Sequence, residues 1–70
     1  MNANEKQNYE NILTLLYANK INKTDFCKYI KISRQGFYKK IKKMTNKEHV
    51  KMIEQMRKFL EERRWKNGNN

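Results

Sequence analysis

Hydrophobic residues recur at the spacing of an α-helix along the first part of the chain. In a first predicted helix, over about residues 5–19, apolar side chains stand at i, i+3, i+4, i+7 and i+8, and they are Tyr9, Ile12, Leu13, Leu16 and Tyr17. The polar stretch 19–23 then connects to a short second helix over about 24–31. We expect Thr24 to cap that helix, with Asp25 in its first turn. The pattern predicts that its buried residues are Phe26, Cys27 and Ile30.

Two further helices follow from the same spacing. Ser33 is a favourable N-cap for a third helix over about 33–44, whose buried side would hold Phe37, Ile41 and Met44. Thr45 and Glu48 are spaced as a capping box at the start of a longer fourth helix over about 46–65. The expected buried residues of that helix are Val50, Met52, Ile53, Met56, Phe59 and Leu60.

These elements predict an all-α fold of about four helices. We expect one compact helix-turn-helix domain over residues 1–66, with the motif at about 24–44, and a disordered polar tail over 67–70. The chain has no proline and two glycines, so strands joined by tight turns lack their usual residues. The prediction therefore includes no β-hairpin wing beside the helices.

The chain is small and strongly basic. Its 70 residues carry 17 Lys and Arg against 7 Asp and Glu, which gives a net charge of +10. A domain of this size buries only about 60% of the surface that its unfolded chain exposes. The charge indicates a polyanionic partner, with nucleic acid first and an anionic membrane second. No apolar run approaches the length of a membrane span, so we expect a cytoplasmic, nucleoid-associated protein.

The composition offers little material for catalysis. Cys27 is the single cysteine, which excludes a disulfide within the chain and fits a reducing compartment. The single histidine, His49, has no second ligand at metal spacing, and Asp25 is the single aspartate. We therefore expect a protein that is not an enzyme and that uses neither a metal ion nor a cofactor. Cys27 is expected as a small buried hydrophobe, and His49 as a residue at a helix edge.

The positive charge is concentrated in the middle of the chain. Residues 20–47 hold ten Lys or Arg and one acidic residue, a net charge of +9, whereas residues 1–19 carry −1 and residues 48–70 carry +2. The same middle segment contains two short predicted helices separated by about three residues, the spacing that a helix-turn-helix needs. Lys31 stands where such a turn usually has a left-handed glycine, a substitution that costs on the order of 1 kcal/mol.

The exposed side of the third predicted helix has residues suited to DNA recognition. Arg34 can hold guanine and Gln35 can hold adenine through paired hydrogen bonds, while Tyr38 suits a thymine methyl group or a phosphate. Gly36 would allow a close approach to the second helix or to DNA. Lysines near this helix are suited to phosphates, which position the protein without specifying a sequence; the candidates are Lys23, Lys28, Lys31, Lys42, Lys43 and Lys47.

The segment CKYIKISRQGFYKKI, Cys27 to Ile41, resembles the helix-turn-helix near the start of insertion-sequence transposases of the retroviral-integrase-like type, and small phage regulators share much of the pattern. In those transposases a Cys or Ala is followed by an aliphatic pair, Ser-Arg, two small or polar residues and two aromatics. The basic linker and the helix from Thr45 to Arg64 resemble the family's next segment. The resemblance implies binding to transposon ends or operators, and it places at the base-reading positions Ser33, Arg34, Gln35, Tyr38 and Lys39. The acidic catalytic triad of that family is not among these residues, and Lys31 departs from the family's glycine.

The long fourth helix is a candidate for dimerisation or for a partner protein. The residues proposed for that surface are Met52, Met56, Phe59 and Trp65, although the methionines are also typical core residues. A homodimer through this helix would suit paired half-sites about one DNA turn apart.

Two functions from different classes remain open at this point. The first is a sequence-specific double-stranded DNA-binding protein, either a mobile-element or phage regulator or the DNA-recognition module of a transposase. The alternative is a phage- or plasmid-encoded inhibitor of the anti-defence type, which would bind a protein target through its basic face and anchor Phe59 and Trp65 there. A membrane-surface peptide is disfavoured, because the basic residues surround a folded motif instead of one amphipathic stripe.

Overall fold

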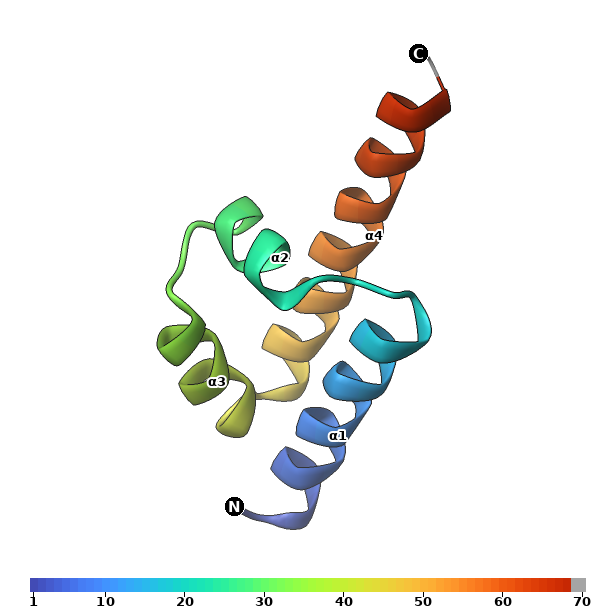
Figure 1. Ribbon diagram of the computed structural model, residues 1–70. Coiled ribbons are helices and arrows are strands. Elements are labelled where there is room, and N and C mark those ends of the chain that lie inside the picture. The colour runs from blue at the N-terminus through green and yellow to red at the C-terminus, as the bar shows by residue number, and fades with distance from the viewer. Residues whose placement is uncertain (69–70) are drawn as a thin grey trace.

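The computed structural model describes residues 1–68, and it describes side chains as far as residue 65. This part of the chain forms four α-helices: α1 Ala3–Ala18, α2 Lys23–Tyr29, α3 Arg34–Lys42 and α4 Asn46–Gly68. α1 and α4 lie side by side and run in the same direction, while α2 and α3 lie together on one side of them (Figure 1). α1 packs on α3 and α4, and α2 packs on the same two helices. The prediction of an all-helical fold is confirmed for the described residues.

Side-chain caps set the beginnings of the helices. Ser33 caps α3 as predicted, since its Oγ accepts a hydrogen bond from the Gly36 N–H at 3.0 Å. The capping box at the start of α4 is also confirmed, with Thr45 and Glu48 each accepting from the other's backbone N–H at 3.2 Å. The expected cap of α2 is wrong. Asn22 accepts from the Asp25 N–H at 3.1 Å, so the helix begins before Thr24.

The two connections that flank α2 share one backbone geometry. Lys20 and Lys31 both have positive φ, 54° and 63° respectively, the left-handed conformation usually taken by glycine. After α2, the Lys31 N–H donates to the Lys28 carbonyl and the Ile32 N–H donates to the Cys27 carbonyl, which is the hydrogen-bond pattern of a Schellman motif. The expected left-handed turn at Lys31 is thereby confirmed, and the same motif closes α1 at Lys20.

One hydrophobic core joins all four helices. Its most deeply buried large side chains are, as the periodicity predicts, Ile12, Leu16, Phe26, Phe37, Ile41, Met44 and Met52. Two expected core residues are wrong: Tyr17 is 89% exposed and Val50 is 66% exposed. Val50 belongs to the first turns of α4, on a side that does not contribute to the core, and Tyr17 lies at the last turn of α1, where the chain turns toward α2. Ile21, in that connection, is buried instead.

Polar contacts bind α1 to the start of α4. Asn8 is buried, and its Nδ2 donates to the Met44 carbonyl at 3.2 Å and to Asn46 Oδ1 at 3.1 Å. One turn further on, Asn11 Nδ2 lies 2.9 Å from Nε2 of His49, which is half-buried at the helix edge. These contacts hold the start of α4 against α1.

α4 is longer than the periodicity predicts. It continues to Gly68, so residues 67 and 68 are helical and not a disordered tail, while the rest of the expected tail, residues 69 and 70, lies outside the described residues. A helix of 23 residues is about 35 Å long, which makes the molecule elongated, with dimensions of 45 × 19 × 19 Å. The C-terminal part of α4 extends beyond the other helices (Figure 1).

Candidate nucleic-acid interface

α2 and α3 are held against each other by aromatic and small side chains. The connection between them is residues 30–33. The rings of Phe26 and Phe37 meet edge to face with centroids 6.0 Å apart, and both side chains are fully buried. Cys27 is buried beside them, and this burial raises the pKa of its thiol. The expectation of a small buried hydrophobe at Cys27 is confirmed, and the α2–α3 unit has a fixed internal packing.

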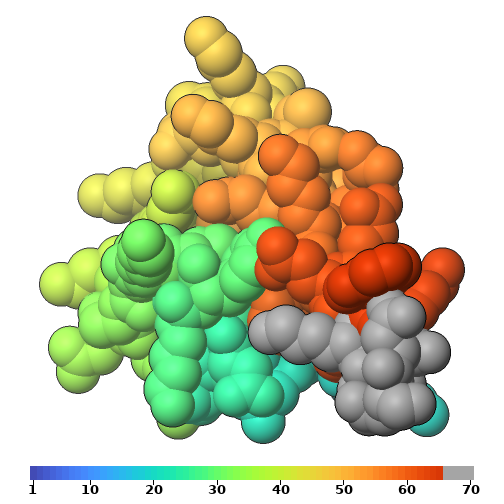
Figure 2. Space-filling model, turned by 90° about the horizontal axis from the view of Figure 1, so that it is seen from above, coloured from blue at the N-terminus to red at the C-terminus, as the bar shows by residue number. Residues whose placement is uncertain are grey.

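α3 has one buried side and one exposed side, as its sequence pattern predicts. Phe37 and Ile41 are buried on the inner side. The outer side presents exposed polar and basic side chains, which are Gln35, Lys39 and Lys42, and Arg34 is exposed at the N-terminal end of the helix. In the view from above, green and yellow-green side chains from this part of the chain project from the left edge of the molecule, on the side away from α4 (Figure 2). A flat or grooved partner therefore has access to this side of α3.

Tyr38 lies between two cations. Its ring is half-buried against Phe37, with ring centroids 5.9 Å apart, and the Lys23 Nζ lies 5.7 Å from the ring centroid. A hydrogen bond from the Lys23 ammonium group lowers the pKa of the Tyr38 hydroxyl, and Arg34 acts in the same direction. This cluster joins the first residue of α2 to the first turns of α3. No spacing in the sequence indicates the contact, because it depends on how the two helices cross.

Ser33 and Gly36 both belong to the N-terminal cap of α3. The Ser33 Oγ already accepts the hydrogen bond that caps α3. A Cβ added at Gly36 would lie 3.1 Å from that same Oγ. The close neighbour of Gly36 is therefore Ser33 and not the second helix, and the glycine leaves room for the cap; its expected approach to DNA stays a prediction.

The candidate phosphate-binding lysines surround α3. Lys28 and Lys31 precede it, Lys42 and Lys43 end it, and Lys47 begins α4; all five are exposed, whereas Lys23 is half-buried beside Tyr38. Among residues 1–65, the ion pairs join Arg57 to Glu54 and Glu61 on α4, and none involves a lysine of the 20–47 segment. These ammonium groups are available to an anionic partner.

The structure does not bring the predicted dimer surface together. Met52 and Met56 are in the core, 1% and 4% exposed, so the expectation that they form a docking surface is wrong. Phe59 is half-buried, with its ring 5.5 Å from that of Phe26 and 5.3 Å from that of Tyr29. Trp65 is 72% exposed near the end of α4. The apolar stripe of α4 packs against α2 and the core, so it is not available as a docking surface.

Within residues 1–68, none of the helices is long and apolar enough to cross a membrane. The described His, Cys, Asp and Glu side chains do not gather in groups of three or more that would suit a metal ion. Comparisons with protein-family models, with curated proteins and with solved structures found no match to this chain.

Proposed function

We propose that this chain is a sequence-specific double-stranded DNA-binding protein, either a regulator of a mobile element or phage or the DNA-recognition module of a transposase. The α2–α3 unit acts as a helix-turn-helix without a wing, and α3 enters the major groove. The observation that carries this proposal is the outer side of α3, which combines exposed hydrogen-bonding side chains with surrounding lysines that have no ion-pair partner among the described residues.

The roles of the residues follow from their positions on α3. Arg34 and Gln35 are exposed in its first turn, the part of a recognition helix that reaches base edges, and their forked side chains match guanine and adenine. Lys39 and Lys42, further along the outer side, and the flanking lysines contact phosphates. An α-helix such as α3 is about 10–12 Å in diameter with its side chains, which fits a major groove about 12 Å wide.

A selection from random double-stranded oligonucleotides at physiological salt tests this proposal, with the complete 70-residue protein as bait. We expect an enriched motif, and we expect Arg34→Ala or Gln35→Ala to relax the preference at one position by about 1–3 kcal/mol. Lys42→Ala should weaken binding to all sequences alike and reduce the salt dependence. Lys58→Ala, an exposed lysine on α4, is the matched control and should leave both properties unchanged.

Two outcomes contradict the proposal in different ways. If all oligonucleotides bind equally and Arg34→Ala lowers only this general affinity, α3 does not read bases. If no oligonucleotide is retained at physiological salt, the basic side of α3 serves another partner, as in the inhibitor alternative.

A further inference from the structure

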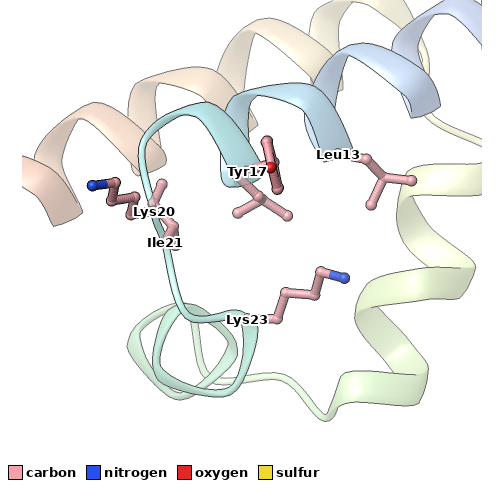
Figure 3. Close-up of a pocket in the computed structure, with 6 residues that line it drawn as sticks. Leu13, Tyr17, Lys20, Ile21 and Lys23 are labelled. Carbon is pink, nitrogen blue, oxygen red and sulfur yellow. The ribbon is translucent and has the colours of Figure 1, made fainter.

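A groove opens at the junction of α1 and α2, formed by α1, the connection after it and the start of α2. Its volume is about 500 Å³, and its lining consists of Leu13, Leu16, Tyr17, Lys20, Ile21 and Lys23. Figure 3 shows Leu13 and Tyr17 on α1 and Lys23 extending from the start of α2 into the space before them. None of the described residues that line this α1 groove is acidic. Its size is within the range of about 300–1,000 Å³ that is typical of ligand-binding clefts.

The groove exposes apolar surface that the fold leaves uncovered. Tyr17 belongs to the apolar stripe of α1 and yet is 89% exposed, and Leu13, one turn earlier, is only half-buried. Leu16 and Ile21 form a buried base beneath them. Burying apolar surface of this kind stabilises a complex by roughly 25 cal/mol per Å² removed from water. A partner that places an apolar side chain in the groove therefore gains binding free energy.

The walls of the groove are preformed. The Lys20 N–H donates to the Tyr17 carbonyl at 3.1 Å and the Ile21 N–H donates to the Leu16 carbonyl at 2.9 Å, which fixes the turn that ends α1. From the other side, the Arg63 guanidinium of α4 donates to the Asn19 and Lys20 carbonyls at 3.3 Å. A preformed site does not lose the entropy of ordering its own walls when a partner binds.

The charge at the groove selects an acidic partner. Lys23 points into the open space before α1, whereas the Lys20 side chain points away from it (Figure 3). A nucleic-acid backbone would satisfy the Lys23 ammonium group but would leave Leu13 and Tyr17 without apolar contacts. A polypeptide segment that carries an aliphatic or aromatic residue beside Asp or Glu satisfies both kinds of surface at once.

We propose that the α1 groove binds an acidic segment of a partner protein, with an apolar side chain of the partner against Leu13 and Tyr17 and a neighbouring carboxylate at Lys23. This interaction surface is formed by α1, the connection after it and the start of α2; it shares Lys23 with the candidate phosphate contacts, and it exists whether or not α3 binds DNA. Through this groove the protein would bind a partner protein at the α1–α2 junction.

A peptide-display selection tests this proposal, with the complete 70-residue protein as bait and a random library of 12-residue peptides as probe. We expect enriched peptides that place an apolar residue beside Asp or Glu. Their affinity, measured by fluorescence polarisation of the synthesised peptides, should fall at least tenfold with Tyr17→Ser and with Lys23→Gln. Val50→Ser is the matched control because Val50 is also an exposed apolar residue, 66% exposed, on a different helix; this variant should bind within twofold of the unmodified protein. Far-UV circular dichroism of each variant establishes that it is folded.

Three results would overturn the proposal. The first is that no peptide is enriched, and the second is that enriched peptides lack acidic residues or bind the Tyr17→Ser variant as tightly as the unmodified protein. The third is that Tyr17→Ser abolishes oligonucleotide binding, which would make the groove part of a nucleic-acid surface. If the unmodified protein retains no oligonucleotide but binds acidic peptides through the groove, the proposed function is contradicted and the groove proposal stands.

Discussion

Replacing Lys31 with glycine should change stability and DNA binding in opposite directions. Lys31 has a φ of 63°, a conformation that costs a residue with a Cβ about 1–2 kcal/mol and costs glycine almost nothing. Glycine also makes the unfolded chain more flexible, which offsets about 0.5–1 kcal/mol of that gain. We therefore expect Lys31→Gly to stabilise the fold by about 0.5–1 kcal/mol. In a domain of this size 1 kcal/mol corresponds to about 4–8 °C, so the expected increase in Tm is about 2–8 °C.

The same substitution removes an ammonium group from the proposed DNA-binding surface. If Lys31 contacts one phosphate, the slope of log K against log salt concentration should become less steep by about 0.9. Both quantities can be measured on one protein preparation, Tm by circular dichroism and binding by fluorescence polarisation of an oligonucleotide duplex over a range of salt concentrations.

Lys20→Gly is the matched control for this experiment. Lys20 ends α1 with the same Schellman motif and a φ of 54°, but it precedes α2 and is not a candidate phosphate contact. It should raise Tm by a similar amount and leave the salt slope unchanged. A lower Tm for Lys31→Gly would refute the strain argument. Equal losses of DNA affinity in both variants would show that bulk charge, and not a contact at Lys31, determines binding.

Further predictions concern the polar contacts of the fold. Asn8→Ala should destabilise the protein by about 1–3 kcal/mol in urea unfolding, because it removes two hydrogen bonds of a buried amide and leaves a buried carbonyl oxygen without its donor. Gly36→Ala should stabilise the protein by up to about 1 kcal/mol in a Ser33→Ala background, since alanine favours the helix, and by less in the unmodified protein, where the new methyl group crowds the capping hydroxyl. Lys23→Ala should raise the pKa of Tyr38, which NMR titration of the ring resonances measures, because the hydrogen bond from Lys23 is the largest influence that lowers it.

Each of these predictions has a result that would contradict it. Gln7→Ala, at an exposed position next to Asn8, should change stability by less than about 0.5 kcal/mol, so an equal effect of both variants would mean that the buried amide is not the cause. The same gain from Gly36→Ala with and without Ser33 would show that the hydroxyl is not crowded. An unchanged pKa of Tyr38 in the Lys23→Ala variant would show that the ammonium group does not bind the hydroxyl in solution.

The helices and most of the core could be predicted because they follow from local spacing. The inner side of α3, with Phe37 and Ile41, is visible in the sequence, and so are the caps at Ser33 and Thr45, because a cap acts over three residues. The outer side of α3 follows from the same periodicity. These features depend on one segment at a time.

The features that could not be predicted depend on how the helices meet. The stripe of α1 gives no sign that Tyr17 is uncovered, because this depends on where the chain turns toward α2. Asn8 is a polar residue of a type usually found on the surface. It is buried because the connection after α3 and the start of α4 lie against it. α1 ends in a Schellman motif at Lys20. Glycine is the usual sequence signal for this motif, so with lysine there only the backbone conformation shows it.

Lys23 connects the two proposed surfaces. Its ammonium group lies 5.7 Å from the centroid of the Tyr38 ring on α3, and its side chain also lines the α1 groove. One ammonium group cannot interact fully with a DNA phosphate and with a partner's carboxylate at the same time. Binding of either partner therefore weakens the binding of the other. Such coupling is reciprocal, since an acidic segment that weakens DNA binding is itself bound less tightly by the DNA complex. If both proposals hold, a protein partner would reduce DNA binding without any movement of α3.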